Sequence, residues 1–390
     1  MHAPFHCSTK NYLWFPLYQP SVPAAAKNTE IFASDYSVNV GNGALFQLER
    51  DLCLLDYSRK YILVDENTIQ HCLPIVMNDV PSLRKAEVIE IESGEKNKTI
   101  DICSSVWAVL AELQADRRSL MVNLGGGVIG DLGGFVAATY KRGIDFINVP
   151  TTLLAQVDAS VGGKVGVDLQ GLKNMVGLFR NPKGVYVYPQ FLKTLPKSEV
   201  MAGFAEMLKH GLIQDAKHFD DLLKFSFSQF EALEPHIIKS IQIKNRVVLD
   251  DPLEKGVRKL LNFGHTIGHA LETYSMETMK RGLLHGEAVA IGMLCEAYLS
   301  REMLELNPEV LERLSAFVLT HYPPFAMDAL AHHRLIEIMR NDKKNVGDEL
   351  NFSLLRNAGD AVHDQQVSAD EVVRALNYYQ SRIQTQIHAS

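Results

Sequence analysis

Short apolar runs rich in β-branched residues alternate with helix-length segments between about residue 35 and residue 195. Five of these runs have the length and composition of strands: 61–65, 86–91, 119–124, 146–150 and 185–188. Strands separated by helix-length segments are typical of a parallel sheet whose crossovers are helices. The pattern therefore predicts that the first half of the chain is an α/β domain with a mainly parallel sheet.

From about residue 196 onward, apolar residues recur at intervals of three and four, which indicates amphipathic helices. We expect a poorly ordered arm (1–33), an α/β nucleotide-binding domain (34–196) and an all-α domain that binds metal and substrate (197–390). Ligand pockets are common where domains meet, so we expect the active site between the last two parts. The predicted helices are 198–213, 230–249, 262–277, 285–302, 308–320 and 368–385, with one strand-like piece at 350–355.

Composition and charge narrow the range of partners. The formal net charge is −7 and the pI is about 6.1, whereas nucleic acid and anionic membranes attract basic proteins. The sequence has no run of about 18 apolar residues, the length that a membrane-spanning helix needs. Five cysteines occur without a CxxC pair or a disulfide-like spacing, which suits a reducing compartment. We therefore expect a cytoplasmic protein that binds neither nucleic acid nor membrane.

A glycine cluster follows the predicted strand 119–124. Gly125, Gly127 and Gly130 match the pattern GxGxxG between a strand and a helix, where backbone N–H groups can approach a pyrophosphate closely. The next strand lacks the terminal acid that holds a ribose in the usual dinucleotide fold; an acid instead ends an upstream strand, at Asp65. The motif favours a dinucleotide site of unusual order, with a tight structural turn as the alternative.

Residue types that bind metals gather in the second half. His265 and His269 lie four residues apart on a predicted helix, hence on one face, and His285 follows. Glu206, on an earlier helix, is a candidate carboxylate ligand, with Lys209 on the same face. Imidazole and carboxylate ligands suit Zn²⁺ or Co²⁺. Spacing alone selects His265 and His269 as the ligand pair, although a single helical histidine is more often packed or solvated.

Basic residues stand inside otherwise apolar or glycine-rich stretches of this acidic protein. A buried charge is costly unless it is paired or meets an anionic ligand. Each residue alone would more often be solvated, but together they suggest a receptor for phosphate and carboxylate groups. The candidates are Arg142, Lys164, Lys173, Lys244, Arg258, Lys343 and Lys344.

Eight strings, in order from the glycine cluster to Lys344, resemble the 3-dehydroquinate synthase family. The resemblance implies that family's fold and activity, which depends on NAD and a divalent metal. The strings are GGGVIGD (125–131), ATYKRG (138–143), VPTTLL (149–154), VDASVGGK (157–164), FAEMLK (204–209), LNFGHTIGH (261–269), LHGE (284–287) and DKK (342–344).

The resemblance changes the metal assignment. It implies that Glu206, His265 and His285 hold Zn²⁺ or Co²⁺, and that His269 belongs to the substrate site. It also implies an NAD site in the first domain, in which Asp158 would act in catalysis as well. The implied NAD residues are Asp65, Glu95, Lys98, Gly126, Gly127, Asp131, Thr151, Thr152, Leu154, Asp158, Lys173, Thr194, Leu195 and Glu199.

The implied substrate is 3-deoxy-D-arabino-heptulosonate 7-phosphate, a small phosphorylated sugar acid. NAD would take a hydride from C5, phosphate would leave by β-elimination, the hydride would return, and an aldol step would close the ring, so the net reaction is that of a lyase. Arg142 would reach the phosphate, across a homodimer if the chain forms one. The other implied contacts are Lys164, Asn174, His269 and Lys343 or Lys344 to phosphate, Lys244 and Arg258 to carboxylate, and Asn262 and Lys209 to hydroxyls.

Three other functions remain open at this point. Another NAD- and metal-dependent sugar phosphate cyclase would share most of the strings but would not need the two carboxylate-binding residues Lys244 and Arg258. A metal-dependent polyol dehydrogenase would share the two-domain plan without the phosphate receptor. A catalytically silent relative would be expected to have lost metal-binding residues.

Overall fold

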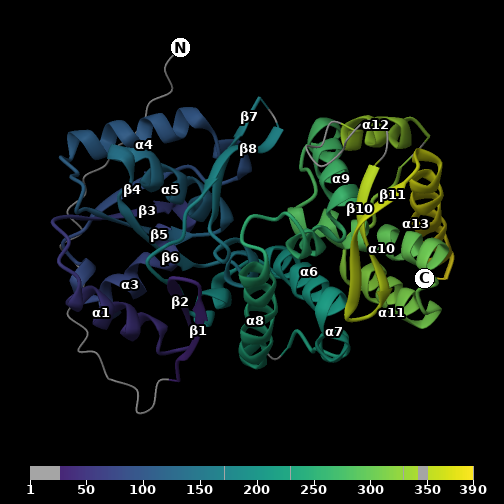
Figure 1. Cartoon of the computed structure of the whole chain (residues 1–390), viewed down its shortest axis with the longest axis horizontal. Coiled ribbons are helices and arrows are strands. Elements are labelled where there is room, and N and C mark those ends of the chain that lie inside the picture. Colours follow the sequence, from purple (N-terminus) through teal and green to yellow (C-terminus); the bar gives the residue numbers. More distant parts are fainter. Residues whose placement is uncertain (1–26, 171, 229, 328, 341–349, 390) are drawn as a thin grey trace. The chain divides into compact units, whose positions relative to one another are not determined.

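The computed structural model describes residues 27–170, 172–228, 230–327, 329–340 and 350–389 (Figure 1). The chain divides into two compact units, Met1–Leu195 and Pro196–Ser390, each with its own buried core. Among the described helices, none is both long and apolar enough to cross a membrane.

A seven-stranded sheet forms the centre of the first unit. Its order is β1-β2-β9-β6-β5-β3-β4, and all neighbours except β1 and β2 pair in parallel. The predicted α/β unit with a mainly parallel sheet is thus confirmed. The strands are β1 Thr29–Ala33, β2 Tyr36–Val40, β3 Lys60–Asp65, β4 Glu87–Ile91, β5 Leu120–Gly125, β6 Asp145–Pro150 and β9 Val185–Val187.

Helices cover both faces of this sheet, with α4 and α5 on one side and α1 and α3 on the other (Figure 1). Neighbouring residues of β3 therefore enter different cores: Tyr61 and Leu63 pack under α4 and α5, and Ile62 and Val64 under α1 and α3. Burial on both faces explains why the strands read as continuous apolar runs. The helices are α1 Ala44–Leu54, α2 Glu66–His71, α3 Leu73–Asp79, α4 Ile100–Glu112 and α5 Gly127–Thr139, and the short helices are η1 Pro81–Leu83, η2 Glu95–Asn97, η3 Tyr140–Arg142, η4 Ala155–Ala159 and η5 Pro189–Thr194.

The order of the strands reverses beside β3. The chain passes from β3 to its neighbour β4, and then crosses to β5 on the other side of β3 before continuing to β6. The loops that follow β3 and β5 consequently diverge, and such a switch point at the carboxyl ends of parallel strands is where ligands bind in doubly wound sheets. Asp65 ends β3 and the glycine cluster follows β5, so the unusual order of the motif reflects this topology.

Two pairs of strands in the first unit were not predicted. The expectation of a poorly ordered arm is wrong for Thr29–Ala33, which pair with β2 while Ile31 and Ala33 turn into the core; residues 1–26 lie outside the described part of the chain. The strands β7 (Lys164–Leu169) and β8 (Leu172–Phe179) form a separate hairpin. Glycines at 166 and 177 face each other across it and weaken the apolar alternation that marks a strand.

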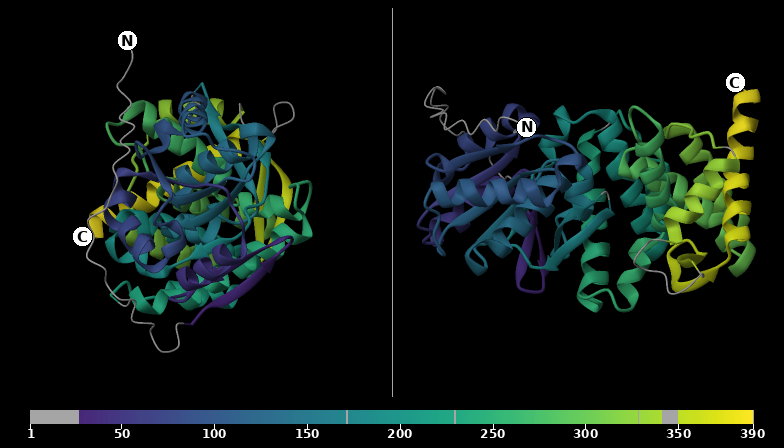
Figure 2. Two further views of the ribbon diagram at one scale, coloured as in Figure 1. Left: turned by 90° about the vertical axis from the view of Figure 1, so that its left-hand side faces the viewer. Right: turned by 90° about the horizontal axis from the view of Figure 1, so that it is seen from above.

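The second unit is built around α10 (His285–Leu304), which packs against α6, α9, α11 and α13. Figure 2 shows α13, in yellow, along one side of this unit. Nearly every residue from 286 to 300 is buried, because neighbouring helices surround α10. The other helices are α6 Lys197–Gln214, α7 Ala216–Leu223, η6 Phe230–Leu233, α8 Glu234–Asp250, η7 Val257–Asn262, α9 His265–Thr278, α11 Pro308–His321, α12 Ala329–Arg340 and α13 Ala369–Ala389.

A hairpin of β10 (Leu350–Asn357) and β11 (Asp360–Val367) is the exception in this helical unit. The sequence predicted the first of these strands, since Phe352, Leu354 and Leu355 are buried. It did not reveal β11, of which only Val367 is buried. The helical character of the second unit is confirmed, and the expectation of an all-α domain holds apart from this hairpin.

A buried histidine gives the second unit a dependence on pH. Nε2 of His218 on α7 lies 2.9 Å from the Ser240 hydroxyl. Burial lowers the pKa of the His218 imidazole from 6.5 to about 3. Between those values the unfolded chain binds a proton that the folded chain does not, so stability falls as the pH falls. This one group should remove about 2 kcal/mol between pH 7 and pH 5.

The measurement is denaturant unfolding of the wild type and of His218→Gln across that range. The glutamine variant should show a shallower loss of stability towards pH 5, because its amide does not titrate. Equal slopes for the two proteins would contradict the assignment.

Candidate active site

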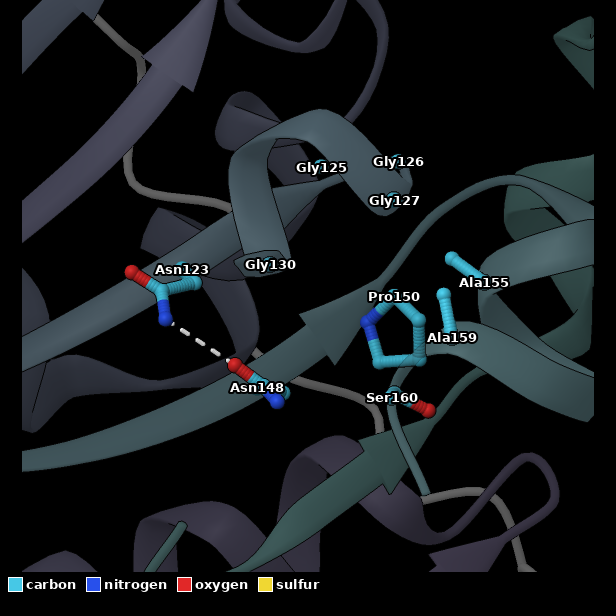
Figure 3. A pocket seen from close by; sticks show the side chains of 10 residues that line it. All are labelled: Asn123, Gly125, Gly126, Gly127, Gly130, Asn148, Pro150, Ala155, Ala159 and Ser160. Atoms are coloured by element: carbon cyan, nitrogen blue, oxygen red, sulfur yellow. Dashed lines mark hydrogen bonds between the residues drawn. The ribbon is translucent and has the colours of Figure 1, made fainter. Parts of the chain in front are cut away.

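A pocket opens beneath the glycine cluster of the first unit (Figure 3). At its base, the Asn123 side chain on β5 donates a hydrogen bond of 3.0 Å to Asn148 on β6. Above them the backbone turns from β5 into α5, whose N-cap residue is Gly126. The N–H groups of a helix N-terminus attract anions, so the pocket suits the pyrophosphate of a dinucleotide.

The glycines of this pocket differ in what a larger side chain would contact. A Cβ atom at Gly125 would lie 2.5 Å from Ile129, and one at Gly126 would lie 3.0 Å from Thr152. A Cβ at Gly130 would meet no atom of the described residues within 4 Å, although Gly130 lines the pocket. The first two therefore permit close packing, whereas Gly130 leaves space for a ligand.

Gly130→Ala is accordingly expected to separate folding from cofactor binding. Alanine is the better helix former by about 1 kcal/mol, so the Tm should stay or rise. The new methyl group should weaken NAD binding about tenfold, which corresponds to about 1.4 kcal/mol, within the usual cost of overpacking. Calorimetric titration with NAD and a thermal melt measure the two effects.

Gly133→Ala is the contrasting variant, because its Cβ would lie 2.0 Å from Asn123 and should destabilise the unit. Unchanged NAD affinity in the folded Gly130→Ala protein would show that this pocket is not the dinucleotide site.

Four residues implied as NAD contacts form one ion cluster. Nζ of Lys98 lies 2.9 Å from Oδ2 of Asp131 and 3.4 Å from Oε1 of Glu95. Nζ of Lys173 lies 3.5 Å from the same Glu95 oxygen. Burial by itself lowers the pKa of Lys98, but Asp131 and Glu95 raise it above the ordinary value, so this lysine stays charged. The cluster joins η2, α5 and β8 beside the glycine loop.

Other implied NAD residues follow the ends of strands. Asp65 ends β3, where its carboxylate accepts the backbone N–H groups of Asn67 and Thr68 as the N-cap of α2. The Thr152 hydroxyl accepts the Ala155 N–H at the start of η4, a π-helix of the kind often found at functional sites. The remaining positions are Thr151 after β6, Leu154 and Asp158 at the N-cap and inside η4, Thr194 and Leu195 at the end of η5, and Glu199 in the first turn of α6 in the second unit.

The residues implied as phosphate contacts in the first unit lie on different elements. Lys164 begins β7, and Asn174 in β8 and Arg142 in η3 both have a positive φ, of 52° and 70°. The Asn174 backbone N–H donates to the Asp168 carboxylate at 2.7 Å, which holds this left-handed residue in place. The other implied contacts, Lys343 and Lys344, lie outside the described residues.

Three helices of the second unit bring one carboxylate and two imidazoles together. Oε1 of Glu206 on α6 lies 3.4 Å from Nε2 of His265, the first residue of α9, and 3.4 Å from Nε2 of His285, the first residue of α10. The other oxygen of Glu206 forms an ion pair with Lys209, one turn later on α6. One carboxylate thus faces a lysine on one side and two histidines on the other.

Hydrogen bonds at the far side of each ring fix its tautomer. Nδ1 of His265 lies 3.1 Å from the Phe263 carbonyl, and Nδ1 of His285 lies 3.2 Å from Oε2 of Glu272. Carbonyl and carboxylate oxygens only accept hydrogen bonds, so both Nδ1 atoms carry a proton. In the neutral rings both Nε2 lone pairs consequently point at Glu206, as they do in histidines that bind a metal.

The distances from the Glu206 oxygen to the two imidazole nitrogens fit a metal ion. Ligand atoms about 2.1 Å from a zinc ion, at the corners of a tetrahedron, lie about 3.4 Å apart. This is the distance of Glu206 Oε1 from each Nε2. When both rings are neutral, two lone pairs and a carboxylate oxygen face one another in a buried place, so the donor set suits a cation such as Zn²⁺ or Co²⁺.

The charges of the site agree with that arrangement. Burial by itself raises the pKa of Glu206, but Lys209 and the two imidazoles hold it well below its usual range. Burial and Lys209 lower the pKa of His265 to about 4, which keeps the ring neutral. Burial opposes the effect of Glu272 and Glu206 on His285, but the carboxylates raise its pKa to about 9. A metal ion at this site therefore competes with a proton on His285.

His269 lies beside the same group. Ligand atoms of His265, His269 and His285 all lie within 4.8 Å of one another, so a site of three histidines is geometrically possible too. The rings of His265 and His269 are 5.1 Å apart, one turn along α9. The structure brings together the pair that spacing selects as well as the set that the resemblance implies.

Further residues implied as substrate contacts belong to elements that pack around η7. Lys209 on α6, Lys244 on α8 and Arg258 on η7 are only 1%, 6% and 1% exposed, and both α6 and α8 pack against η7. Asn262 at the end of η7 donates to Glu254 at 3.1 Å. Lys244 and Arg258, the two residues implied for the carboxylate, are thus buried cations on adjoining elements.

Sequence reasoning missed Glu272 and Glu254. Glu272 stands three residues after His269 and seven after His265, a spacing that places all three on one face of α9. That pattern could have revealed Glu272. Glu254 lies in the loop before η7 with a positive φ of 59°, and no periodic signal marks it.

Comparisons with known proteins establish the family of the chain. The sequence model of the family 3-dehydroquinate synthase N-terminal matches residues 88–202, and that of the family 3-dehydroquinate synthase C-terminal matches residues 203–345. A 3-dehydroquinate synthase from Parabacteroides distasonis is 42% identical over 335 residues, which cover 85% of this chain and 94% of the relative. One from Leptospira interrogans is 37% identical over 338 residues, which cover 85% and 91%.

Solved structures share the fold at lower identity. A 2-deoxy-scyllo-inosose synthase with carbaglucose-6-phosphate, NAD⁺ and Co²⁺ matches with a TM-score of 0.79 and 24% identity over 90% of this chain and 100% of that one. The 2-epi-5-epi-valiolone synthase of Streptomyces hygroscopicus, with NAD⁺ and Zn²⁺, matches with a TM-score of 0.78 and 24% identity, over 91% of this chain and 99% of that one. An iron-containing alcohol dehydrogenase from Thermotoga maritima matches with a TM-score of 0.64 and 13% identity, over 90% of this chain and 100% of that one. From the two matched domains and the curated relatives together, it follows that the chain belongs to the 3-dehydroquinate synthase family.

Proposed function

We propose that the chain converts 3-deoxy-D-arabino-heptulosonate 7-phosphate to 3-dehydroquinate and phosphate, as a lyase that uses NAD and a divalent metal. The observation that carries the proposal is the meeting of Glu206, His265 and His285 at 3.4 Å spacings in a chain 42% identical to a 3-dehydroquinate synthase. Two structures of the same fold, both with NAD⁺, contain Co²⁺ or Zn²⁺.

In this proposal Glu206, His265 and His285 hold the metal, and the pocket under Gly126 and Gly127 holds NAD. When bound, NAD supplies a reversible hydride acceptor for C5 of the substrate, and the metal ion a Lewis acid for the C4 and C5 hydroxyls. Lys209 neutralises one oxygen of Glu206 and presents its ammonium group beside those hydroxyls. The hydrogen bonds at Nδ1 of the two imidazoles keep both Nε2 atoms directed at the metal site.

The cationic residues of the chain orient the substrate. Lys244 and Arg258 would bind its carboxylate, with Asn262 and Lys209 at its hydroxyls. The phosphate would be held by Lys164, Asn174, His269, Arg142 and Lys344, and positioned so that its own oxygen accepts the proton lost in the elimination. Positioning of this kind can contribute several kcal/mol to the lowering of a barrier. Asp158 would assist within the NAD site.

The cell compartment and the assembly belong to the same proposal. The described cysteines, Cys53, Cys72, Cys103 and Cys295, are free thiols, which supports a reducing, cytoplasmic environment. A homodimer would allow Arg142 of one copy to reach the phosphate in the other.

An assay of the purified protein with substrate, NAD and Zn²⁺ or Co²⁺ tests the function. Inorganic phosphate should appear in step with 3-dehydroquinate while NADH does not accumulate, because each turnover returns the hydride. Sedoheptulose 7-phosphate, which lacks the carboxylate, serves as the comparison substrate and should turn over at least 100-fold more slowly, since loss of one buried ion pair costs about 3 kcal/mol.

Two results would overturn the proposal. Preference for sedoheptulose 7-phosphate would indicate another sugar phosphate cyclase. Steady production of NADH from simple polyols would indicate a dehydrogenase like the iron-containing enzymes that share the fold.

A further inference from the structure

The peptide group between Phe263 and Gly264 is held from both sides. Its carbonyl accepts a hydrogen bond from Nδ1 of His265 at 3.1 Å, and its N–H donates to Oε2 of Glu296 on α10 at 2.5 Å. Oε1 of Glu296 accepts a second hydrogen bond, of 3.2 Å, from the Ile267 N–H in the first turn of α9. One carboxylate, 0% exposed, therefore reaches His265 through a single peptide group.

We propose that Glu296 is a positioning residue for the metal site, which holds His265 in its Nδ1–H tautomer and aims Nε2 at Glu206. The chain of contacts runs from the Glu296 carboxylate through the Gly264 N–H and the Phe263 carbonyl to Nδ1 of His265. Because a peptide group is polarised by an acceptor at its N–H, its carbonyl becomes a stronger acceptor for the imidazole. The inference rests on the metal site of the proposed function.

The start of α9 depends on this carboxylate. Its N-cap residue is Gly264, which has a positive φ of 79° and no side chain that could accept the first N–H groups of the helix. Glu296 supplies that acceptor from the neighbouring helix. The usual N-cap serine or aspartate is thus replaced by a carboxylate from another element, which ties the first turn of α9 to α10.

Close packing of the two helices makes the connection rigid. A Cβ on Gly292 would lie 2.1 Å from the Gly264 carbonyl oxygen, and a Cβ on Gly268 would lie 3.1 Å from the Val289 Cα. The backbones of α9 and α10 therefore approach too closely for larger residues. The position of His265 relative to His285, the first residue of α10, is set by this contact and by the two hydrogen bonds of Glu296.

A carboxylate orients each of the two imidazoles, one by a direct hydrogen bond and the other through an intervening peptide group. Glu272 accepts directly from Nδ1 of His285, whereas Glu296 acts on His265 through one peptide group. Carboxylates behind metal-binding histidines fix the ring and raise its basicity, and their replacement typically lowers metal affinity by about 10- to 100-fold. An effect transmitted through a peptide group should lie near the lower end of that range.

Glu296→Gln tests the proposal with little change of shape. The amide keeps one accepting oxygen but turns an NH₂ group towards one of the two N–H donors, so one hydrogen bond is lost. We expect Co²⁺ and Zn²⁺, each added alone to the metal-free protein, to bind about tenfold more weakly in competition with a chelator. The visible spectrum of the Co²⁺ form should shift, because the His265 ring is held less firmly.

Nitrogen NMR of ¹⁵N-histidine protein supplies a readout that a merely structural role would not move. In the metal-free wild type His265 should be the Nδ1–H tautomer, and Glu296→Gln should introduce the other tautomer. Asp215→Ala is the matched control: it removes a carboxylate that caps α7 by accepting the His218 N–H at 3.0 Å. This control should lower the Tm and leave metal affinity and the His265 signals unchanged.

The outcomes separate the two proposals. A wild type that binds no metal in a 1:1 ratio refutes the metal site of the proposed function. A wild type that binds metal while Glu296→Gln has the same affinity, spectrum and His265 tautomer refutes the role of Glu296. Equal loss of metal affinity in Asp215→Ala and Glu296→Gln refutes it too, because the effect would then come from lowered stability alone.

Discussion

His265→Ala is expected to lose its metal ion and at least about 1,000-fold in kcat/KM while the protein stays folded. The substitution removes one of the two imidazole nitrogens that stand 3.4 Å from Glu206. The remaining carboxylate and imidazole cannot complete a tetrahedral site. The fold should survive, because the ring is bonded to the Phe263 carbonyl and to the site rather than to the apolar core.

His269→Ala separates the two possible ligand sets. If Glu206, His265 and His285 hold the metal, this variant keeps stoichiometric zinc and loses activity through its substrate contacts. If the three histidines within 4.8 Å of one another are the ligands, it loses zinc as His265→Ala does. His333→Ala, at an exposed position of α12, is the control and should match the wild type.

Metal content by mass spectrometry, activity and circular dichroism are measured on all three variants. Full zinc occupancy in folded His265→Ala would show that this histidine is not a ligand. Loss of zinc in His269→Ala would instead favour the site of three histidines.

Local patterns sufficed for most of the fold. The runs that became β3, β5 and β6 were visible because strands buried on both faces are continuously apolar, as Ile62 and Leu63 illustrate. The long helices of the second unit were visible through their apolar spacing. The strands β1, β2, β7, β8 and β11 were missed, since each is short, exposed or interrupted by glycine, as with Phe32 in β1, which is 75% exposed.

The site was less accessible to spacing alone. Periodicity along one helix relates His265 to His269, but it carries no information on the distance from α9 to Glu206 on α6 or to His285 on α10. Only the family's pattern of motifs supplied the full metal set, which stays a proposal until ligands are measured. Glu296 could not have been predicted, because its partners are backbone N–H groups that carry no sequence signature.

Replacement of the glycine that follows His285 should impair zinc binding and also destabilise the fold. A Cβ on Gly286 would lie 2.0 Å from the carbonyl oxygen and 2.3 Å from the Cα atom of Ala202 on α6. Both are backbone atoms in the middle of a buried helix, so neither can turn aside as a side chain can. Gly286→Ala must therefore push α10 away from α6 or break the start of α10.

Such a shift acts on the site directly. His285 precedes Gly286, and Glu206 follows Ala202 by about one turn of α6, so separating the helices opens the 3.4 Å gap between the imidazole and the carboxylate. We expect Gly286→Ala to lower the free energy of unfolding by about 3 kcal/mol or more, the upper part of the range for overpacking. The molecules that remain folded should bind zinc at least about tenfold more weakly.

Denaturant unfolding and zinc competition measure these two effects, and a double variant identifies their cause. Ala202→Gly removes the only side-chain carbon of Ala202 but leaves its carbonyl and Cα in place. Adding it to Gly286→Ala should therefore restore neither stability nor zinc binding. Recovery in the double variant would mean that the contact involves the alanine side chain, and that α6 and α10 are not held backbone to backbone at the metal site.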